Sequence, residues 1–236
     1  LRDLSQPERV YDEPFPSRVE FVRGGFGDEK LSRRSGRSAF LWPTVTRVGF
    51  EAQALSYFSH GTEGNTGLSS PKRYLWDTDP RHHAWRFNPG PDGVGGDSGP
   101  VTTGPFVGQL REDGEELTPG EPPAVTALFS RGALMSFFVA EVLLQAFVQI
   151  NSPGRRYERA YSDAPRRLRR AILTLPTAMP LAERKLFARR VSIAVRLTWR
   201  ALGLDESQAP EPFLQWDEAT GTQIVFLYNE VKHNFQ

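Results

Sequence analysis

Residues 171–203 read AILTLPTAMPLAERKLFARRVSIAVRLTWRALG and predict a strand, a turn and a helix in that order. The short apolar run from Ala171 ends at Pro180, which is typical of a strand followed by a turn. Pro180 suits the first turn of a helix, and Gly203 is a common stop signal. Side chains at three- and four-residue spacing indicate an amphipathic helix between them. The positions on its inner face are Phe187, Val191, Ala194, Val195, Thr198 and Leu202.

The pattern continues on both sides of this unit. Downstream, residues Phe213–Trp216 predict a short strand, and Asp217 with Glu218 opens a helix, because acidic side chains suit the positive end of the helix dipole. Upstream, residues 130–151 predict a helix with Ser130 as its N-cap. The second half of the chain, 124–236, therefore alternates helices and strands, as α/β folds do.

The predicted helix at 130–151 is apolar enough to raise the question of a membrane. Glu141, Gln145 and Gln149 recur at four-residue spacing and form one polar stripe on it. We expect a buried core helix whose stripe faces a wet edge or a partner, and no transmembrane segment.

The first half carries strand signals instead. Residues Ser17–Gly24 alternate in polarity, and Ala39–Gly49 is rich in β-forming residues. Residues 88–123 contain 16 Gly or Pro among 36 positions, which predicts an insertion loop without regular elements. We expect a strand-rich part of one lobe at 1–87, this loop at 88–123, and the α/β part of the same lobe at 124–236.

Composition excludes several classes of protein and site. The 236 residues are 39% hydrophobic and 24% charged, which is typical of a globular chain. Without cysteine there are no disulfides, thiolate metal sites or cysteine nucleophiles. The chain has no P-loop and no Rossmann glycine motif. His82 and His83 are adjacent, so their rings point apart, and we expect no metal site.

The first residues of the sequence show whether a starting methionine and a signal peptide are present. Residue 1 is Leu, and the first residues are polar, with no apolar segment of a signal peptide. We expect an internal fragment of a cytoplasmic protein, with the remainder of the parent chain as its first partner and another protein as a further one.

Charge is unevenly distributed along the chain. Residues 154–200 hold 13 Lys or Arg and 3 Asp or Glu, whereas residues 201–236 hold 1 and 6. The arginines between Arg155 and Arg170 are either an anion-binding surface or a solvated rim that pairs with the acidic C-terminal segment. We expect no nucleic-acid partner, because no helix-turn-helix or zinc-finger pattern is present.

One lysine and one carboxylate stand out by their positions. Lys72 lies in NTGLSSPKRYLWD, residues 65–77, and Glu218 lies at the start of the last predicted helix. Brought together, they would suit phosphoryl transfer to water: the lysine would offset charge on the transferring group, and the carboxylate would orient water. The residues alone leave open that both are ordinary surface charges.

Four blocks of the chain resemble, in the same order, the first lobe of the DnaK-type heat-shock chaperone ATPases of the actin-like superfamily. The blocks are Arg47–Ala52, Asn65-Thr66 with Lys72-Arg73, Leu173–Thr177, and Asp217–Thr220 running into Tyr228. The resemblance implies an α/β fold, a partial actin-like ATPase lobe of ribonuclease H-like architecture, and a parent protein that hydrolyses ATP with Mg²⁺.

The resemblance also implies roles for four side chains. Lys72 matches the chaperone lysine near the γ-phosphate, and Glu218 matches the acidic residue at the head of the connecting helix. Pro176 and Arg184 match the proline and arginine that link nucleotide state to the surface, so they would form a nucleotide-coupled switch. The chain departs from the family in lacking the Asp-x-Gly-Thr and Asp-x-Gly-Gly phosphate hairpins, and in having Pro71 and one extra residue before Lys72. We therefore expect the fragment to be inactive alone, with no tightly bound nucleotide.

The chain is similar over most of residues 17–236 to SrfB, a family of large bacterial proteins described as virulence factors. The similar stretches are residues 55–77, 147–153, 163–184 and 216–223. The alternative to an ATPase of this family is a degenerate, non-catalytic lobe that binds a protein, a nucleic acid or an anionic surface.

Overall fold

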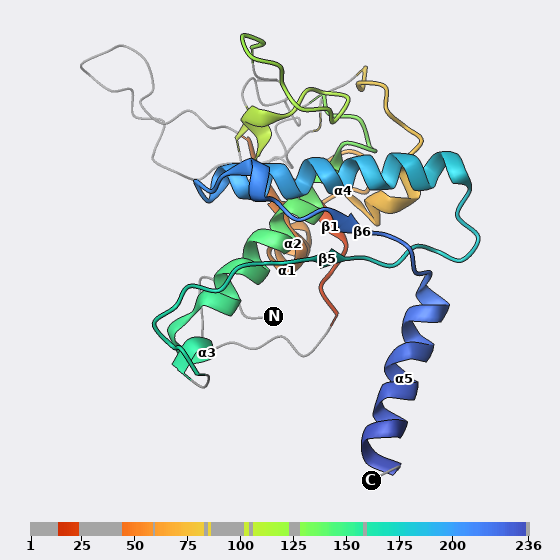
Figure 1. Ribbon diagram of the computed structural model, residues 1–236. Coiled ribbons are helices and arrows are strands. Elements are labelled where there is room, and N and C mark those ends of the chain that lie inside the picture. The colour runs from red at the N-terminus through yellow and green to blue at the C-terminus, as the bar shows by residue number, and fades with distance from the viewer. Residues whose placement is uncertain are drawn as a thin grey trace.

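Five helices and two small sheets make up the described part of the protein, shown as a computed structural model in Figure 1. The structure describes residues 14–23, 44–58, 60–82, 85, 102–103, 106–122, 128–157 and 160–234. The helices are α1 (Gly49–Phe58), α2 (Leu134–Asn151), α3 (Pro153–Tyr157), α4 (Leu181–Ala201) and α5 (Glu218–Asn234). The strands are β1 (Arg18–Arg23), β2 (Thr44–Val48), β3 (Gly67–Ser69), β4 (Thr102–Thr103), β5 (Ala171–Ile172) and β6 (Pro212–Phe213). Short 3₁₀ turns lie at Pro71–Tyr74, Val107–Gln109 and Glu206–Gln208.

The larger sheet comes from the first half and has the order β3-β1-β2-β4. Strand β1 pairs antiparallel with β2 and β3, and β2 pairs parallel with β4. Helix α1 follows β2 directly and packs on β1 and β2. The strands at 18–23 and 44–48 agree with the predicted ones, whereas α1 was not predicted, and residues 39–43 lie outside the described part of the chain.

The second half contains the predicted strand-helix-strand unit. Strands β5 and β6 are parallel, and α4 connects them. Their pairing continues beyond the strands, because Leu175 and Asp217 form a further parallel bridge. The fold is therefore mixed α/β, as expected. Whether it is an actin-like lobe stays a prediction.

The core lies where α4 crosses α2 (Figure 1). Five of the six positions predicted for the inner face of α4 are buried, and only Leu202 is partly exposed. Strand β1 adds Val19 and Phe21, both fully buried, and Phe21 stacks on Trp85 with 5.4 Å between ring centroids. One core thus joins both halves of the chain.

Helix α2 begins later than the sequence indicates. Ser130 does not cap it: the hydroxyl of Ser130 accepts from the N–H of Ala133, which starts a turn that leads into the helix at Leu134. The first turns are buried, whereas the last turns are half-buried. By length and composition α2 could cross a membrane, and among the described residues it is the one helix that could.

The predicted loop at 88–123 is partly anchored. Its described residues include β4, a 3₁₀ turn and an antiparallel bridge between Leu110 and Glu116. Phe106 and Leu110 are buried in the main core. The prediction from glycine and proline content therefore missed these short elements. A few apolar side chains are enough to fix a segment against a core.

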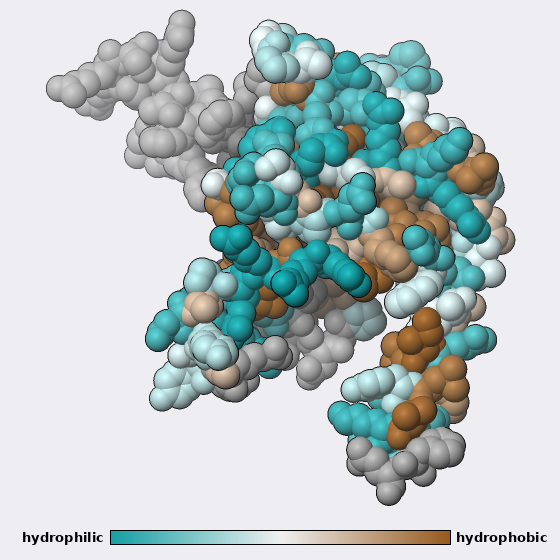
Figure 2. Space-filling view, in the orientation of Figure 1, coloured by the Kyte–Doolittle hydropathy of each residue, from teal (hydrophilic) through white to brown (hydrophobic). Residues whose placement is uncertain are grey.

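Helix α5 extends away from the body toward the C-terminus (Figure 1). Figure 2 shows apolar side chains over this helix. The exposed apolar residues of α5 are Ile224, Val225, Phe226, Leu227, Tyr228 and Val231. Five consecutive residues of this kind span more than one helical turn, so apolar side chains lie on all sides of this part of α5.

Candidate functional site

Lys72 and Glu218 are in direct contact. Lys72 Nζ lies 2.6 Å from Glu218 Oε1, although 146 positions separate the two residues. The side chain of Lys72 is 33% exposed and that of Glu218 is 53% exposed. A pair this exposed contributes at most about 1 kcal/mol to folding. Both charged groups therefore remain accessible from solvent.

Short, ordered segments position the two side chains. Lys72 lies in the 3₁₀ turn that follows Ser70, whose backbone is left-handed with φ of 49°. Glu218 is the first residue of α5, and its N–H donates to the carbonyl of Leu175 at 2.8 Å. This hydrogen bond ties the start of α5 to the chain that leaves β5.

Asp217 caps α5. Its Oδ1 accepts from the N–H of Thr220 at 2.7 Å. Hydrogen bonds from Thr220, and a smaller contribution from the charge of Arg184, hold the pKa of Asp217 below its usual value. Because Asp217 and Glu218 both lie at the start of α5, an anion is disfavoured directly at this helix end and would meet Lys72 instead.

Pro176 and Arg184 lie close to the same point. Pro176 directly follows Leu175, which bridges to Asp217. Arg184 is in the first turn of α4, and its Nε donates to the carbonyl of Met179 at 2.9 Å. The structure thus gathers all four residues singled out in the sequence around the Leu175–Asp217 bridge. Their functional roles stay predictions.

Direct metal binding has no support in the described part of the chain, where no three His, Cys, Asp or Glu side chains are grouped to hold an ion. The Lys72–Glu218 pair offers one ammonium and one carboxylate. It therefore fits contact with a phosphate and with water, including water bound to an ion, rather than a ligand cage.

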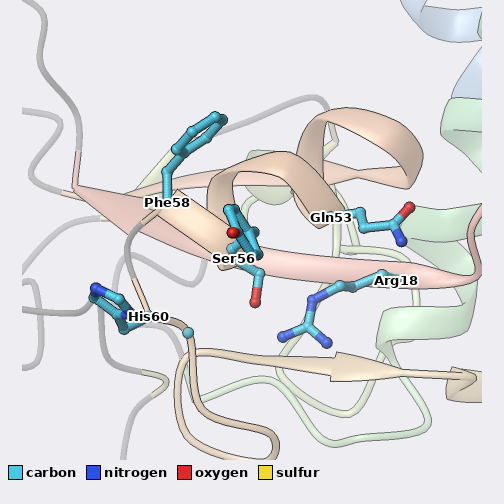
Figure 3. Close-up of a pocket in the computed structure, with 7 residues that line it drawn as sticks. Arg18, Gln53, Ser56, Phe58 and His60 are labelled. Atoms are coloured by element: carbon cyan, nitrogen blue, oxygen red, sulfur yellow. The ribbon is translucent and has the colours of Figure 1, made fainter.

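A separate hollow of about 640 Å³ lies beside the end of α1. In Figure 3, Arg18 and Ser56 point into the space between α1 and the segment that follows it. The lining residues are Arg18, Gln53, Ser56, Tyr57, Phe58, His60 and Gly61.

Arg18 does not offer a free charge to this hollow. Its Nε and a terminal nitrogen lie 2.9 and 2.7 Å from Glu20 Oε2, and its other terminal nitrogen lies 3.1 Å from Glu63 Oε2. Glu20 is fully buried, which raises its pKa, while a hydrogen bond from Thr66 at 2.5 Å and the charge of Arg18 oppose that rise. The guanidinium is satisfied by two carboxylates, so Arg18 is not free to bind an anion in this hollow.

Two glycines allow the chain to close over Glu20. A Cβ at Gly61 would lie 2.5 Å from Glu20 Oε1, and a Cβ at Gly67 would lie 2.1 Å from Glu20 Oε2. At Gly67 a Cβ would also clash with the backbone carbonyl of Val19, so only glycine fits there. Gly61 and Gly67 thus have a packing role around a buried carboxyl group.

Two buried charges were not predicted from the sequence. Glu20 is in β1 and Arg190 is in α4, and both are almost fully buried. A glutamate between Val19 and Phe21 has the period of an outward-facing strand position, so the pattern alone suggests exposure. Its burial follows from α1 and the 60–67 segment covering that face of the sheet.

Comparisons with known proteins place the chain in one family. The family model described as virulence factor SrfB matches residues 1–236. No curated protein and no solved structure matches the chain significantly. The resemblance to actin-like and chaperone ATPases therefore has no support from these comparisons. Since the match covers every residue, the chain belongs to the SrfB virulence factor family.

Proposed function

We propose that the chain forms part of an ATP-hydrolysing site of actin-like type, in which Lys72 stabilises negative charge and Glu218 orients water. The supporting observation is the 2.6 Å contact between Lys72 Nζ and Glu218 Oε1. Two surface charges chosen from distant parts of a sequence rarely meet by coincidence. The resemblance that singled them out matches Lys72 to the lysine near the γ-phosphate and Glu218 to the acidic residue at the head of the connecting helix.

The chemistry of the pair suits phosphoryl transfer to water. Lys72 would approach the γ-phosphate and offset the charge on its oxygens. Glu218, held by the first turn of α5, would accept a hydrogen bond from the attacking water or from water on the ion. When bound, Mg²⁺ supplies further charge neutralisation between the phosphates. In that state the ammonium would exchange Glu218 for a phosphate oxygen, which frees the carboxylate for water.

Pro176 and Arg184 are the proposed switch residues. Pro176 lies next to the bridge that anchors α5, and Arg184 holds the turn before α4 through the carbonyl of Met179. A shift of Glu218 on nucleotide binding would therefore move the start of both helices. We propose that the remainder of the parent chain packs on the apolar residues of α5 and receives this movement.

The test is Mg²⁺–ATP binding by calorimetry and phosphate release, measured on the full-length protein. Lys72→Gln and Glu218→Gln should each retain nucleotide binding and lower the turnover rate by about 10²–10³-fold, the usual loss when one charge-stabilising group is removed. Arg73→Gln is the matched control, because Arg73 is an exposed cation on the same turn. It should leave turnover within about twofold.

Two results would overturn this proposal. One is a wild-type protein that neither binds nor hydrolyses ATP, which would favour a non-catalytic interaction module. The other is an equal loss of turnover in Arg73→Gln, which would indicate general charge rather than a positioned lysine.

A further inference from the structure

A cluster of arginines lies at the end of α2. We call it the Arg–Tyr tip and define it as residues 155–157 and 160–170, which comprise the last part of α3 and the segment that leads back toward β5. In Figure 1 the tip lies at the end of α2 that is farthest from the crossing with α4. It is therefore a protrusion.

Three arginines of the tip, Arg156, Arg166 and Arg167, donate hydrogen bonds to neutral acceptors. Arg156 Nε donates to the carbonyl of Ser162 at 2.7 Å, and Arg166 donates to the carbonyl of Ala160 at 2.7 Å. Arg167 reaches only the amide oxygen of a glutamine, Gln208, at 3.4 Å. Within the described chain, no carboxylate forms an ion pair with Arg156, Arg166, Arg167, Arg169 or Arg170. Their positive charge is thus available to an anionic partner.

Two tyrosines accompany these charges. Tyr157 is 88% exposed and Tyr161 is 84% exposed. Tyrosine is amphipathic, with an apolar ring and a polar hydroxyl, and it is enriched where proteins meet the headgroup region of a bilayer. Arginine beside it matches the phosphates of the same region.

The tip is held in place rather than loosely attached. The side chain of Asn151, the last residue of α2, accepts from the N–H of Arg166 at 2.8 Å and donates to its carbonyl at 3.0 Å. This double hydrogen bond fixes the returning segment to the helix end. The arginines and tyrosines are therefore presented together.

We propose that the Arg–Tyr tip binds the anionic surface of a phospholipid bilayer, with the arginines on lipid phosphates and the tyrosines among the headgroups. A protrusion suits a flat surface, whereas a single strand of nucleic acid is bound in a groove that follows its backbone. Val148, which is 41% exposed on the last turns of α2, adds apolar surface beside the tip.

The experiment is co-sedimentation of the full-length protein with vesicles of phosphatidylcholine alone and with vesicles that also contain phosphatidylglycerol. The protein should bind the anionic vesicles, and added salt should weaken that binding. Arg169→Gln with Arg170→Gln should lower the affinity about 30-fold, because each arginine near an anionic surface contributes one charge. Tyr157→Ser should lower it further.

Matched variants separate the tip from general charge. Arg73→Gln with Lys185→Gln removes two exposed cations from the turn before Tyr74 and from the beginning of α4, which lies on the opposite side from α3 in Figure 1. Tyr57→Ser removes an equally exposed tyrosine, one that is 80% exposed on α1. Both controls should keep the wild-type affinity within about threefold, since charges farther away than about 10 Å are screened.

Three results would overturn the proposal: no sedimentation with anionic vesicles, an unchanged affinity in the Arg169/Arg170 variant, or equal losses in the control variants. Single-stranded DNA serves as a competitor. If it displaces the vesicles and binds the wild-type protein more tightly than they do, the tip is a nucleic-acid surface instead. None of these measurements involves ATP, so their outcome is independent of the proposed hydrolysis.

Discussion

The arginines of α4 and those of the Arg–Tyr tip are one residue type in opposite surroundings. On α4, Arg190 contacts Glu115 at 3.3 Å, and Arg200 contacts Glu206 at 2.7 Å. Arg196 pairs with Glu116. In the tip, the described arginines that carry no carboxylate partner face carbonyls, an amide or solvent.

The paired arginines of α4 and the arginines of the Arg–Tyr tip differ in what they contribute to the protein. Glu115 and Glu116 belong to the segment 106–122, so their ion pairs fasten that segment to α4 and contribute to the fold. Arg156, Arg166, Arg167, Arg169 and Arg170 form no such pairs within the described chain, and their charges repel one another. Arginine that is paired within the chain stabilises it, whereas arginine left unpaired at a protrusion is a surface for a partner.

The largest effect should come from Arg190, which is 1% exposed. Its terminal nitrogens meet Glu115 and, at 2.6 Å, the carbonyl of Asp113. Arg190→Ala should lower the free energy of unfolding by about 2–5 kcal/mol, because it opens a cavity in the core and removes the hydrogen bond to the carbonyl of Asp113. Urea unfolding monitored by tryptophan fluorescence measures it.

Arg189 provides the internal control. It pairs with the same Glu115 at 2.7 Å, but its side chain is 65% exposed. Arg189→Ala should cost at most about 1 kcal/mol. Similar losses in both variants would show that burial does not distinguish the arginines of α4 from those of an exposed surface.

A smaller effect should come from Glu141, a carboxyl group of α2 that lacks a close cation. Gln145 donates to its Oε1 at 3.0 Å, and its Oε2 is buried without a hydrogen-bond partner. Burial raises the pKa of Glu141, with a further rise from Glu51 and an opposing effect of Arg47. A raised folded-state pKa means that stability is lost as the pH rises through it.

Glu141→Gln should therefore raise the free energy of unfolding at pH 7 by about 1–2 kcal/mol. The gain should vanish in acid, below the ordinary pKa of a glutamate, where the wild-type side chain is already neutral. Thermal unfolding across this pH range is the measurement. If Glu141→Gln instead lowers the free energy of unfolding at neutral pH, the carboxylate gains more from an interaction with a partner than it loses by burial.

The smallest effect on stability should come from the tip. Arg169→Gln with Arg170→Gln should change the free energy of unfolding by no more than about 0.5 kcal/mol, because neither side chain has an ion-pair partner to lose. Urea unfolding at low salt checks this. A loss as large as that of Arg189→Ala would place these arginines among the structural ones.

Local patterns predicted the second half of the fold well. Residues 171–218 form strand, helix, strand and helix start as expected, because proline, glycine and the spacing of apolar residues act within a few positions. Helix α1 was missed, since its ten residues are held by packing on β1 and β2 rather than by a strong pattern. Helix α2 begins later than predicted because the Ser130 hydroxyl caps a separate turn that precedes the helix.

The residues of the candidate site were predicted from the sequence, but the contact between them was not. Resemblance singled out Lys72 and Glu218, and the contact between them depends on where α5 begins relative to the 3₁₀ turn at Pro71–Tyr74. The burial of Glu20 was not predicted, because its hydrogen-bond partner Thr66 lies 46 positions away in the sequence.

By itself, the sequence determined the types of element around residues 171–218, the absence of thiol chemistry and the concentration of basic residues in 154–200. Only the tertiary structure decided which arginines are neutralised. Arg190 and Arg196 meet carboxylates 75 and 80 positions away, whereas the tip carries similar arginines without such partners. Charge is a property of each residue, but its compensation depends on distances in space, and packing of the core sets those distances.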